Sequence, residues 1–234
     1  MKRQLQFVHV GKCGGSTVKK LLLLSPVIKE RYSSCFESHI NGVVVDSNCD
    51  YLFCLRNPID RAFSAFEWRR KLIFEDALTD QVRRFPGERK VLRKYSSLGA
   101  MARSLYRSDG LLDQAVARDF HCVHHLRESI SFYCRPLLGV LTPCNLFGVV
   151  CQETLAFDCT RLLGVDASGL RERRNESKRR IDHDLDGDAV NNLKRFLVED
   201  YQCIAALWSL GVLSDQQFCR VMKSSVGNEV ASEL

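Results

Sequence analysis

Two glycines, a lysine and two hydroxyl residues follow an apolar run near the start of the chain. The run at residues 7–10 has the composition of a buried strand, and Gly14 and Gly15 predict a tight turn after it. Ser16 and Thr17 then open a predicted helix. Glycine lets backbone N–H groups approach a ligand closely, and a helix N-terminus attracts anions. This stretch therefore predicts a phosphate-binding turn, with an ordinary strand–turn–helix corner as the alternative.

Lys12 precedes the glycines and adds a mobile positive charge beside the turn. Cys13 stands between this lysine and the glycines, so we count it with the site. The spacing differs from that of the NTPase P-loop, in which four residues separate a first Gly from a Gly-Lys-Ser/Thr run. No Gly-Lys-Ser or Gly-Lys-Thr occurs in the chain. The turn has the parts of a phosphate cradle without the ATPase signature.

A second candidate anion site follows the next strong apolar run, at residues 51–55. Such a continuous run is typical of a parallel strand covered on both faces. Arg56 comes directly after it, and Asn57 with Pro58 predicts the start of a helix that carries Ser64. Ligands of α/β proteins bind at the carboxyl ends of the strands, so Arg56 and Ser64 are candidate anion ligands. The alternative is an arginine at a strand end that pairs with a carboxylate.

His39 lies in residues 27–42, which we expect to be mostly loop. Imidazole is suited to accept a proton near neutral pH, although a lone loop histidine is more often a surface residue. Three further histidines crowd one helical segment, but no His-Glu-x-x-His arrangement is present, so no metal site is expected. They are His121, His124 and His125.

The composition is that of an ordinary globular protein. The 234 residues are 45% hydrophobic and 26% charged, and a net charge of +6 favours anionic partners such as a nucleic acid, an acidic glycan, a nucleotide or a membrane surface. No stretch approaches the roughly 18 apolar residues of a membrane span, and no leader is visible, so we expect a cytoplasmic protein. The 11 cysteines include no Cys-x-x-Cys pair, which fits a reducing compartment.

The alternation of apolar runs with helical patterns predicts an α/β fold in one domain over residues 1–223, with a flexible tail at 224–234. Short strands are expected at 43–45 and 146–151, and helices at 155–163 and in a last long segment capped by Asp188. Residues 69–140 are expected to be a mainly helical insertion. Residues 69–107 of this insertion hold eleven Lys/Arg against four acids. These cations form either a solvated surface or a wall that binds an acceptor substrate.

The two candidate anion sites together resemble those of sulfotransferases that use 3′-phosphoadenosine 5′-phosphosulfate (PAPS), and most closely the carbohydrate sulfotransferase branch. Residues 55–66 are similar to the motif that binds the donor's 3′-phosphate in that family. The first stretch resembles the family's His-x-x-Lys-x-Gly-Gly-(Ser/Thr) loop, except that Cys13 stands where Thr is more usual. The matching residues are His9, Lys12, Gly14, Gly15 and Ser16.

This resemblance implies the sulfotransferase fold, a P-loop-like parallel sheet flanked by helices, and PAPS as co-substrate without a metal. Lys12 and the N–H groups from Gly14 to Thr17 would hold the 5′-phosphate, and Arg56 with Ser64 the 3′-phosphate. A loop with Arg174, Asn175 and Ser177 would close over the adenosine.

The resemblance also implies transfer of a sulfuryl group to a hydroxyl of a glycan, an acidic one included, or of a small molecule, without nucleic acid as a partner. A histidine between the two motifs often serves as the base in the glycan branch, which makes His39 the candidate. Glu37, His124 and His125 are the alternative candidates for this base. Two other functions stay open: a kinase with a degenerate phosphate loop, and a non-catalytic basic module that binds an acidic polymer.

Overall fold

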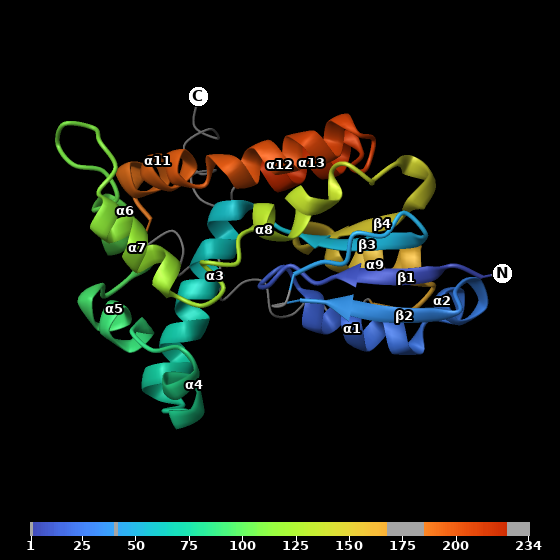
Figure 1. The fold of residues 1–234 in the computed structure, drawn as a ribbon, viewed down its shortest axis with the longest axis horizontal. Helices are drawn as coiled ribbons and strands as arrows, with labels where there is room; N and C mark the ends of the chain where they lie inside the picture. The colour runs from blue at the N-terminus through green and yellow to red at the C-terminus, as the bar shows by residue number, and fades with distance from the viewer. Residues whose placement is uncertain (1, 40–41, 168–184, 224–234) are drawn as a thin grey trace, which may run out of the picture. The chain divides into compact units, whose positions relative to one another are not determined.

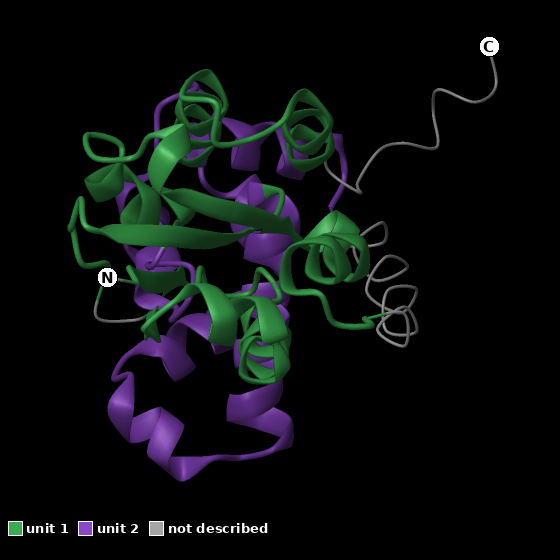
Figure 2. Ribbon diagram, turned by 90° about the vertical axis from the view of Figure 1, so that its right-hand side faces the viewer, with its two compact units in different colours: residues 1–57, 129–173, 199–223 green, residues 58–128, 174–198, 224–234 purple. Residues whose placement is uncertain are grey.

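The computed structural model describes residues 2–39, 42–167 and 185–223. The predicted adenosine-covering residues Arg174, Asn175 and Ser177 and the tail at 224–234 lie outside these residues. The chain divides into two compact units, drawn in different colours in Figure 2. The first unit comprises residues 1–57, 129–173 and 199–223, and the second comprises 58–128, 174–198 and 224–234.

The first unit is built on a four-stranded sheet in the order β2-β1-β3-β4, with every neighbouring pair parallel. The strands are β1 (Gln4–Val8), β2 (Ser34–Ser38), β3 (Cys49–Leu55) and β4 (Leu146–Cys151). The arrows of β1, β2 and β3 in Figure 1 point the same way. The carboxyl ends of the strands therefore meet at one edge of the sheet, where the residues that follow each strand come together.

Helices cover both faces of this sheet. All seven residues of β3 are buried, and successive side chains of a strand point to opposite faces, so both faces of the sheet are covered at β3. The apolar core of the unit joins the strands to side chains from the surrounding helices. These are α1 (Gly15–Leu24), α2 (Pro26–Arg31), α8 (Ile130–Cys134), α9 (Leu155–Leu163), α12 (Val198–Ser209) and α13 (Asp215–Met222). The expected parallel sheet flanked by helices is confirmed.

Short polar residues set the ends of several of these helices. Ser25 caps α2 by accepting the Ile28 N–H, and its hydroxyl donates to the Leu163 carbonyl at 2.6 Å, which ties α2 to the end of α9. Ser214 and Gln217 form a reciprocal capping box at α13.

Three expected local features differ in the structure. Residues 43–45 form no strand, because Val44 and Val45 are about half exposed and pair with no neighbouring strand. The strand beside β1 is instead β2, inside the segment expected to be loop, and α2 also lies there. The last long helix is two helices, α11 (Gly187–Phe196) and α12. The side chain of Asp186, rather than Asp188, caps α11 by accepting the Ala189 N–H.

In its described part the second unit has helices and connecting loops, and its one β pairing is an isolated bridge between Tyr106 and Leu112. Its helices include α3 (Pro58–Arg70), which runs into a π-helical turn at Lys71–Glu75. The others are α4 (Thr79–Arg84), α5 (Glu88–Lys94), α6 (Leu98–Arg103), α7 (Gln114–Cys122) and α11. α6 packs against both α3 and α11, and α5 packs against α7.

A buried ion pair joins α3 to α5 in this unit. The Arg69 guanidinium, 1% exposed, donates to Glu88 Oε1 at 2.8 Å and to Oε2 at 2.5 Å. Arg69 also donates to Gln81 and lies over the Phe85 ring, while Glu88 Oε1 accepts the His124 N–H. This arginine of the basic stretch is therefore part of the core and not of a cationic surface.

No helix in the described part of the chain has both the length and the apolar content needed to cross a membrane. The 11 cysteines are all free thiols. Seven of them are buried and behave as small apolar side chains.

We predict that Glu88→Gln lowers the free energy of unfolding by about 3 kcal/mol, because it leaves the Arg69 guanidinium buried without its counter-charge. Urea unfolding followed by circular dichroism measures the loss. Asp109→Asn is the matched control, since Asp109 pairs with Arg107 in the same unit but both side chains are about half exposed. Its loss is expected to stay below about 1 kcal/mol. Equal losses in the two variants would contradict the prediction.

Candidate functional site

The glycine turn connects β1 to α1 at the carboxyl edge of the sheet. Gly14 has φ 83° and precedes α1, with no side-chain cap on the helix. Its carbonyl accepts the N–H groups of Thr17 and Val18. The N–H groups of Gly15 and Ser16 come before these first bonds and have no carbonyl within the helix to receive them. The turn therefore presents backbone donors at the positive end of a ten-residue helix.

Close packing on two sides explains why both positions are glycine. A side chain at Gly15 would overlap the His9 imidazole, and one at Gly14 would overlap the Gln152 amide, which follows β4. At Gly14 the left-handed backbone also favours glycine.

Lys12 and Cys13 contribute to the turn in different ways. Lys12 has φ 69°, a left-handed conformation that is uncommon outside glycine. The residue is half-buried. Cys13 is completely buried in the apolar core, and its N–H donates to the Val10 carbonyl. The thiol of Cys13 is thus a packing group, and only the backbone of this residue belongs to the turn.

Arg56, the first residue after β3, lies beside the glycine turn. Its guanidinium donates to the Lys12 carbonyl at 3.4 Å, and the side chain is half-buried. No carboxylate within residues 2–39, 42–167 and 185–223 pairs with Arg56. The alternative of a strand-end ion pair therefore finds no partner in this part of the chain. The structure brings together the turn and a second cation.

Glu153 and Asn57 hold the neighbouring strand ends together. Glu153, two residues after β4, accepts the Asn57 backbone N–H at 3.0 Å, and the buried Asn57 amide donates to the Val221 carbonyl at 2.9 Å. The backbone that carries Arg56 is therefore anchored to β4 and to α13.

His39 directly follows β2 and is half-buried at the same edge. Its Nδ1 lies 2.7 Å from the His9 carbonyl oxygen. A carbonyl can only accept, so Nδ1 carries the proton and Nε2 carries the lone pair of the neutral ring. The His39 and His9 rings stack with centroids 4.1 Å apart.

The sequence alone did not reveal the bonds of His9 and Glu37. His9 is 7% exposed, its Nδ1 lies 2.5 Å from Glu37 Oε1, and Glu37 Oε2 accepts from Lys19 Nζ at 2.5 Å. Burial acts to raise the pKa of Glu37, but the hydrogen bonds from Lys19 and His9 outweigh it and hold that pKa below its usual value. Glu37 is thus poorly suited to replace His39 as a base.

Ser64 and Arg61 lie on α3 in the second unit. Ser64 is half-buried there. Arg61 is 1% exposed, and its guanidinium donates to the carbonyls of His125 and Glu128, so this arginine supports the local backbone.

Three other side chains of the second unit lie close enough together to be potential metal ligands. His124, His125 and Glu128 each offer an atom within 4.8 Å of the others. The Glu128 carboxylate already accepts two hydrogen bonds from the Arg127 guanidinium and one from the His125 N–H. These bonds, with His124 beside the carboxylate, hold the pKa of Glu128 well below its usual value against the effect of burial. The carboxylate is committed to a local network that organises the segment after α7.

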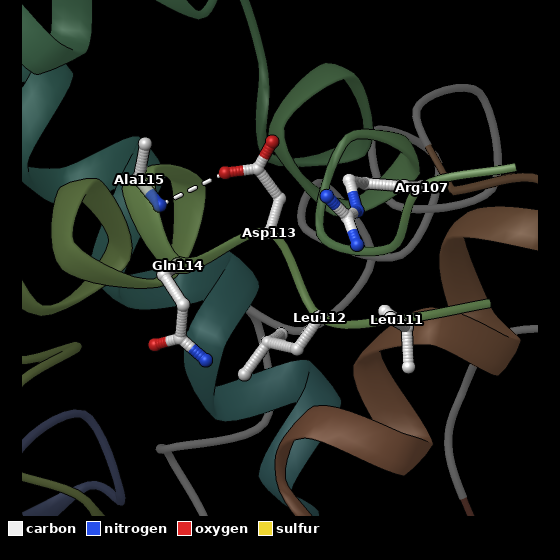
Figure 3. Close-up of a pocket in the computed structure, with 6 residues that line it drawn as sticks. All are labelled: Arg107, Leu111, Leu112, Asp113, Gln114 and Ala115. Atoms are coloured by element: carbon white, nitrogen blue, oxygen red, sulfur yellow. Dashed lines mark hydrogen bonds between the residues drawn. The ribbon is translucent and has the colours of Figure 1, made fainter. Parts of the chain in front are cut away.

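The second unit also has a hollow of about 570 Å³ beside the start of α7, shown in Figure 3. Asp113 caps α7 there, and its carboxylate accepts the Ala115 N–H. None of the sequence-predicted site residues lines this hollow. Its lining is Arg107, Leu111, Leu112, Asp113, Gln114 and Ala115.

Comparison with protein-family models, with curated proteins and with solved structures finds no match to the chain.

We predict that Gly15→Ala lowers the free energy of unfolding by about 1–3 kcal/mol, because the added methyl group would displace the His9 ring. Urea unfolding measures the change. Gly139→Ala is the control, since a side chain at Gly139 in the same unit meets open space. A Gly15→Ala variant as stable as this control would show that the turn does not depend on the contact with His9.

Proposed function

We propose that the chain is a PAPS-dependent sulfotransferase that moves a sulfuryl group to a hydroxyl of a glycan or a small molecule. The observation that carries the proposal is the position of the Arg56 guanidinium, 3.4 Å from the Lys12 carbonyl. A donor with phosphate groups on both the 3′ and the 5′ oxygen of one ribose needs two cationic sites close together at the strand ends. Lys12 and Arg56 follow the neighbouring strands β1 and β3, which supports such a pair of sites.

In this proposal the glycine turn holds the 5′-phosphate end of PAPS. The N–H groups of Gly14, Gly15 and Ser16 and the Lys12 ammonium stabilise negative charge on the bridging oxygen as its bond to sulfur breaks. The Thr17 N–H, also predicted to take part, already donates to the Gly14 carbonyl. Arg56 holds the 3′-phosphate, while the role predicted for Ser64, which lies on α3 in the second unit, stays a prediction. The product is 3′-phosphoadenosine 5′-phosphate (PAP).

His39 is the proposed base. As the new S–O bond forms, Nε2 of the neutral ring accepts the proton of the acceptor hydroxyl. The bond from Nδ1 to the His9 carbonyl supports this role, because it leaves the lone pair on Nε2. Sulfuryl transfer, like phosphoryl transfer, depends mainly on positioning and on charge stabilisation.

We predict that PAP binds more tightly than AMP in calorimetry, and that Arg56→Ala weakens PAP binding about ten- to a hundredfold. This range corresponds to the loss of a charge-assisted hydrogen bond worth roughly 1.5–3 kcal/mol. AMP lacks the 3′-phosphate, so its affinity should not change. Arg135→Ala is the control, because Arg135 is exposed and pairs with Glu199 in the same unit.

Other results of this calorimetry would count against the proposal. Equal weakening of PAP and AMP in Arg56→Ala would remove Arg56 from 3′-phosphate recognition. Preferential binding of ATP with Mg²⁺ would favour the kinase alternative. Binding of an acidic polymer alone, with a steep loss of affinity as salt rises, would favour the non-catalytic module.

We predict that His39→Asn retains PAP affinity within about twofold while the turnover number falls about 10²- to 10⁴-fold, the usual contribution of a general base. The Asn amide can still donate to the His9 carbonyl but cannot take up a proton at neutral pH. Transfer of ³⁵S from labelled PAPS to the best acceptor found in a screen of hydroxyl compounds measures turnover. A variant with wild-type turnover would exclude His39 from proton transfer.

A further inference from the structure

The His9 side chain lies at the centre of the contacts behind the glycine turn. Its ring stacks on His39 with an interplanar angle of 14° and on Phe7 with centroids 5.5 Å apart, and it fills the space that a Cβ at Gly15 would need. The His9 backbone is held as well, since its N–H donates to the Ser38 carbonyl at 2.9 Å. A shift of this ring would therefore move both His39 and the turn.

Glu37 determines how the His9 ring is held. The carboxylate lies 2.5 Å from His9 Nδ1 and accepts from Lys19 at its other oxygen. Glu37 is ionised at neutral pH, because its pKa is held low by these donors against the effect of burial. A carboxylate can only accept, so His9 carries its proton on Nδ1. The carboxylate thus sets both the tautomer and the orientation of a buried imidazole, as the third member of a catalytic triad does.

The position of Glu37 in the sheet makes the arrangement specific. In the parallel register Glu37 pairs with Phe7 and Ser38 pairs with Val8, so Glu37, His9 and His39 come from the ends of two adjacent strands. Lys19 lies on α1, is more than half exposed, and donates to Oε2 of the carboxylate, while Oε1 faces His9. A Lys–Glu pair with an exposed lysine adds little stability by itself. The part-buried bond to His9 matters more, because it fixes the orientation of a buried ring.

We propose that Glu37 is a positioning residue that acts through His9 to hold His39 and the glycine turn in the geometry for sulfuryl transfer. This inference rests on the function proposed above. Glu37 does not touch the reacting groups. Its effect passes from the carboxylate to the His9 ring, from that ring to the stacked His39 ring, and from the His9 carbonyl to His39 Nδ1.

The charged groups around His9 give the inference a spectroscopic signature. Burial lowers the pKa of His9, the hydrogen bond and charge of Glu37 oppose that effect, and His39 and Lys19 add to it. Removal of the Glu37 charge should therefore lower the pKa of His9 further. Removal of His39 should raise it. Histidine ¹⁵N and ¹H NMR titrations of the wild type, Glu37→Gln and His39→Asn measure both directions and identify the tautomer of His9.

The test combines this titration with kinetics on the whole chain. In Glu37→Gln we expect the turnover number to fall at least tenfold, PAP affinity by calorimetry to change less than about threefold, and the pKa of His9 to fall. Glu30→Gln is the matched control, because Glu30 is an exposed glutamate of α2 in the same unit. Lys19→Met removes the Lys19–Glu37 pair and leaves the Glu37–His9 bond in place, and we expect turnover within about twofold of wild type.

The outcomes separate this inference from the proposed function. A wild-type chain that binds PAP and transfers sulfate, with Glu37→Gln at full turnover, would overturn the inference alone. An Nε2–H tautomer of His9 in the wild type would also overturn it. A wild-type chain that neither binds PAP nor transfers sulfate would overturn the proposed function, and with it the catalytic role of Glu37. A Lys19→Met variant as slow as Glu37→Gln would assign the effect to the Lys19–Glu37 pair instead.

Discussion

Parallel pairing of all four strands is the constraint on which the candidate site depends. Because the strands run the same way, the residues that follow them meet at one edge, although they are far apart in the sequence. His9, His39, Arg56 and Gln152 all reach this edge in the first unit. The hydrogen bonds that continue beyond the strands, from His9 N–H to Ser38 and from Asn57 N–H to Glu153, keep these ends in register. The sheet topology therefore determines which side chains meet at the candidate site.

The apolar runs were sufficient to predict much of this sheet. β3 and β4 are continuous apolar segments, and α3 begins at Pro58 as the Asn57-Pro58 pair indicates. β2 was missed because it is an edge strand with a mixed sequence, of which only Ser38 is fully buried. Val43–Val45 showed the opposite error, since β-branched residues favour strands but form one only where a partner strand is available. Local propensity does not contain that information.

The same limit applies to the site. Glycines and a lysine in a short stretch have a local meaning, so the turn could be predicted from its own residues. The link between Glu37 and His9 depends on which strand lies beside β1, and without β2 the glutamate could not be placed. Similarly, the composition of the basic stretch could not show that Arg69 lies in the core with Glu88. The one-domain organisation over residues 1–223 and the roles of the adenosine-covering loop stay predictions.

The left-handed backbone of Lys12 lowers stability at a position where the proposed function needs a lysine. A lysine in the left-handed region carries a conformational strain of about 1–2 kcal/mol that glycine would not have. A search for more heat-resistant variants would therefore favour glycine here, and each such variant would lose the ammonium group beside the turn. Directed evolution for thermal tolerance alone is thus expected to select against the charge that the proposed phosphate site would use.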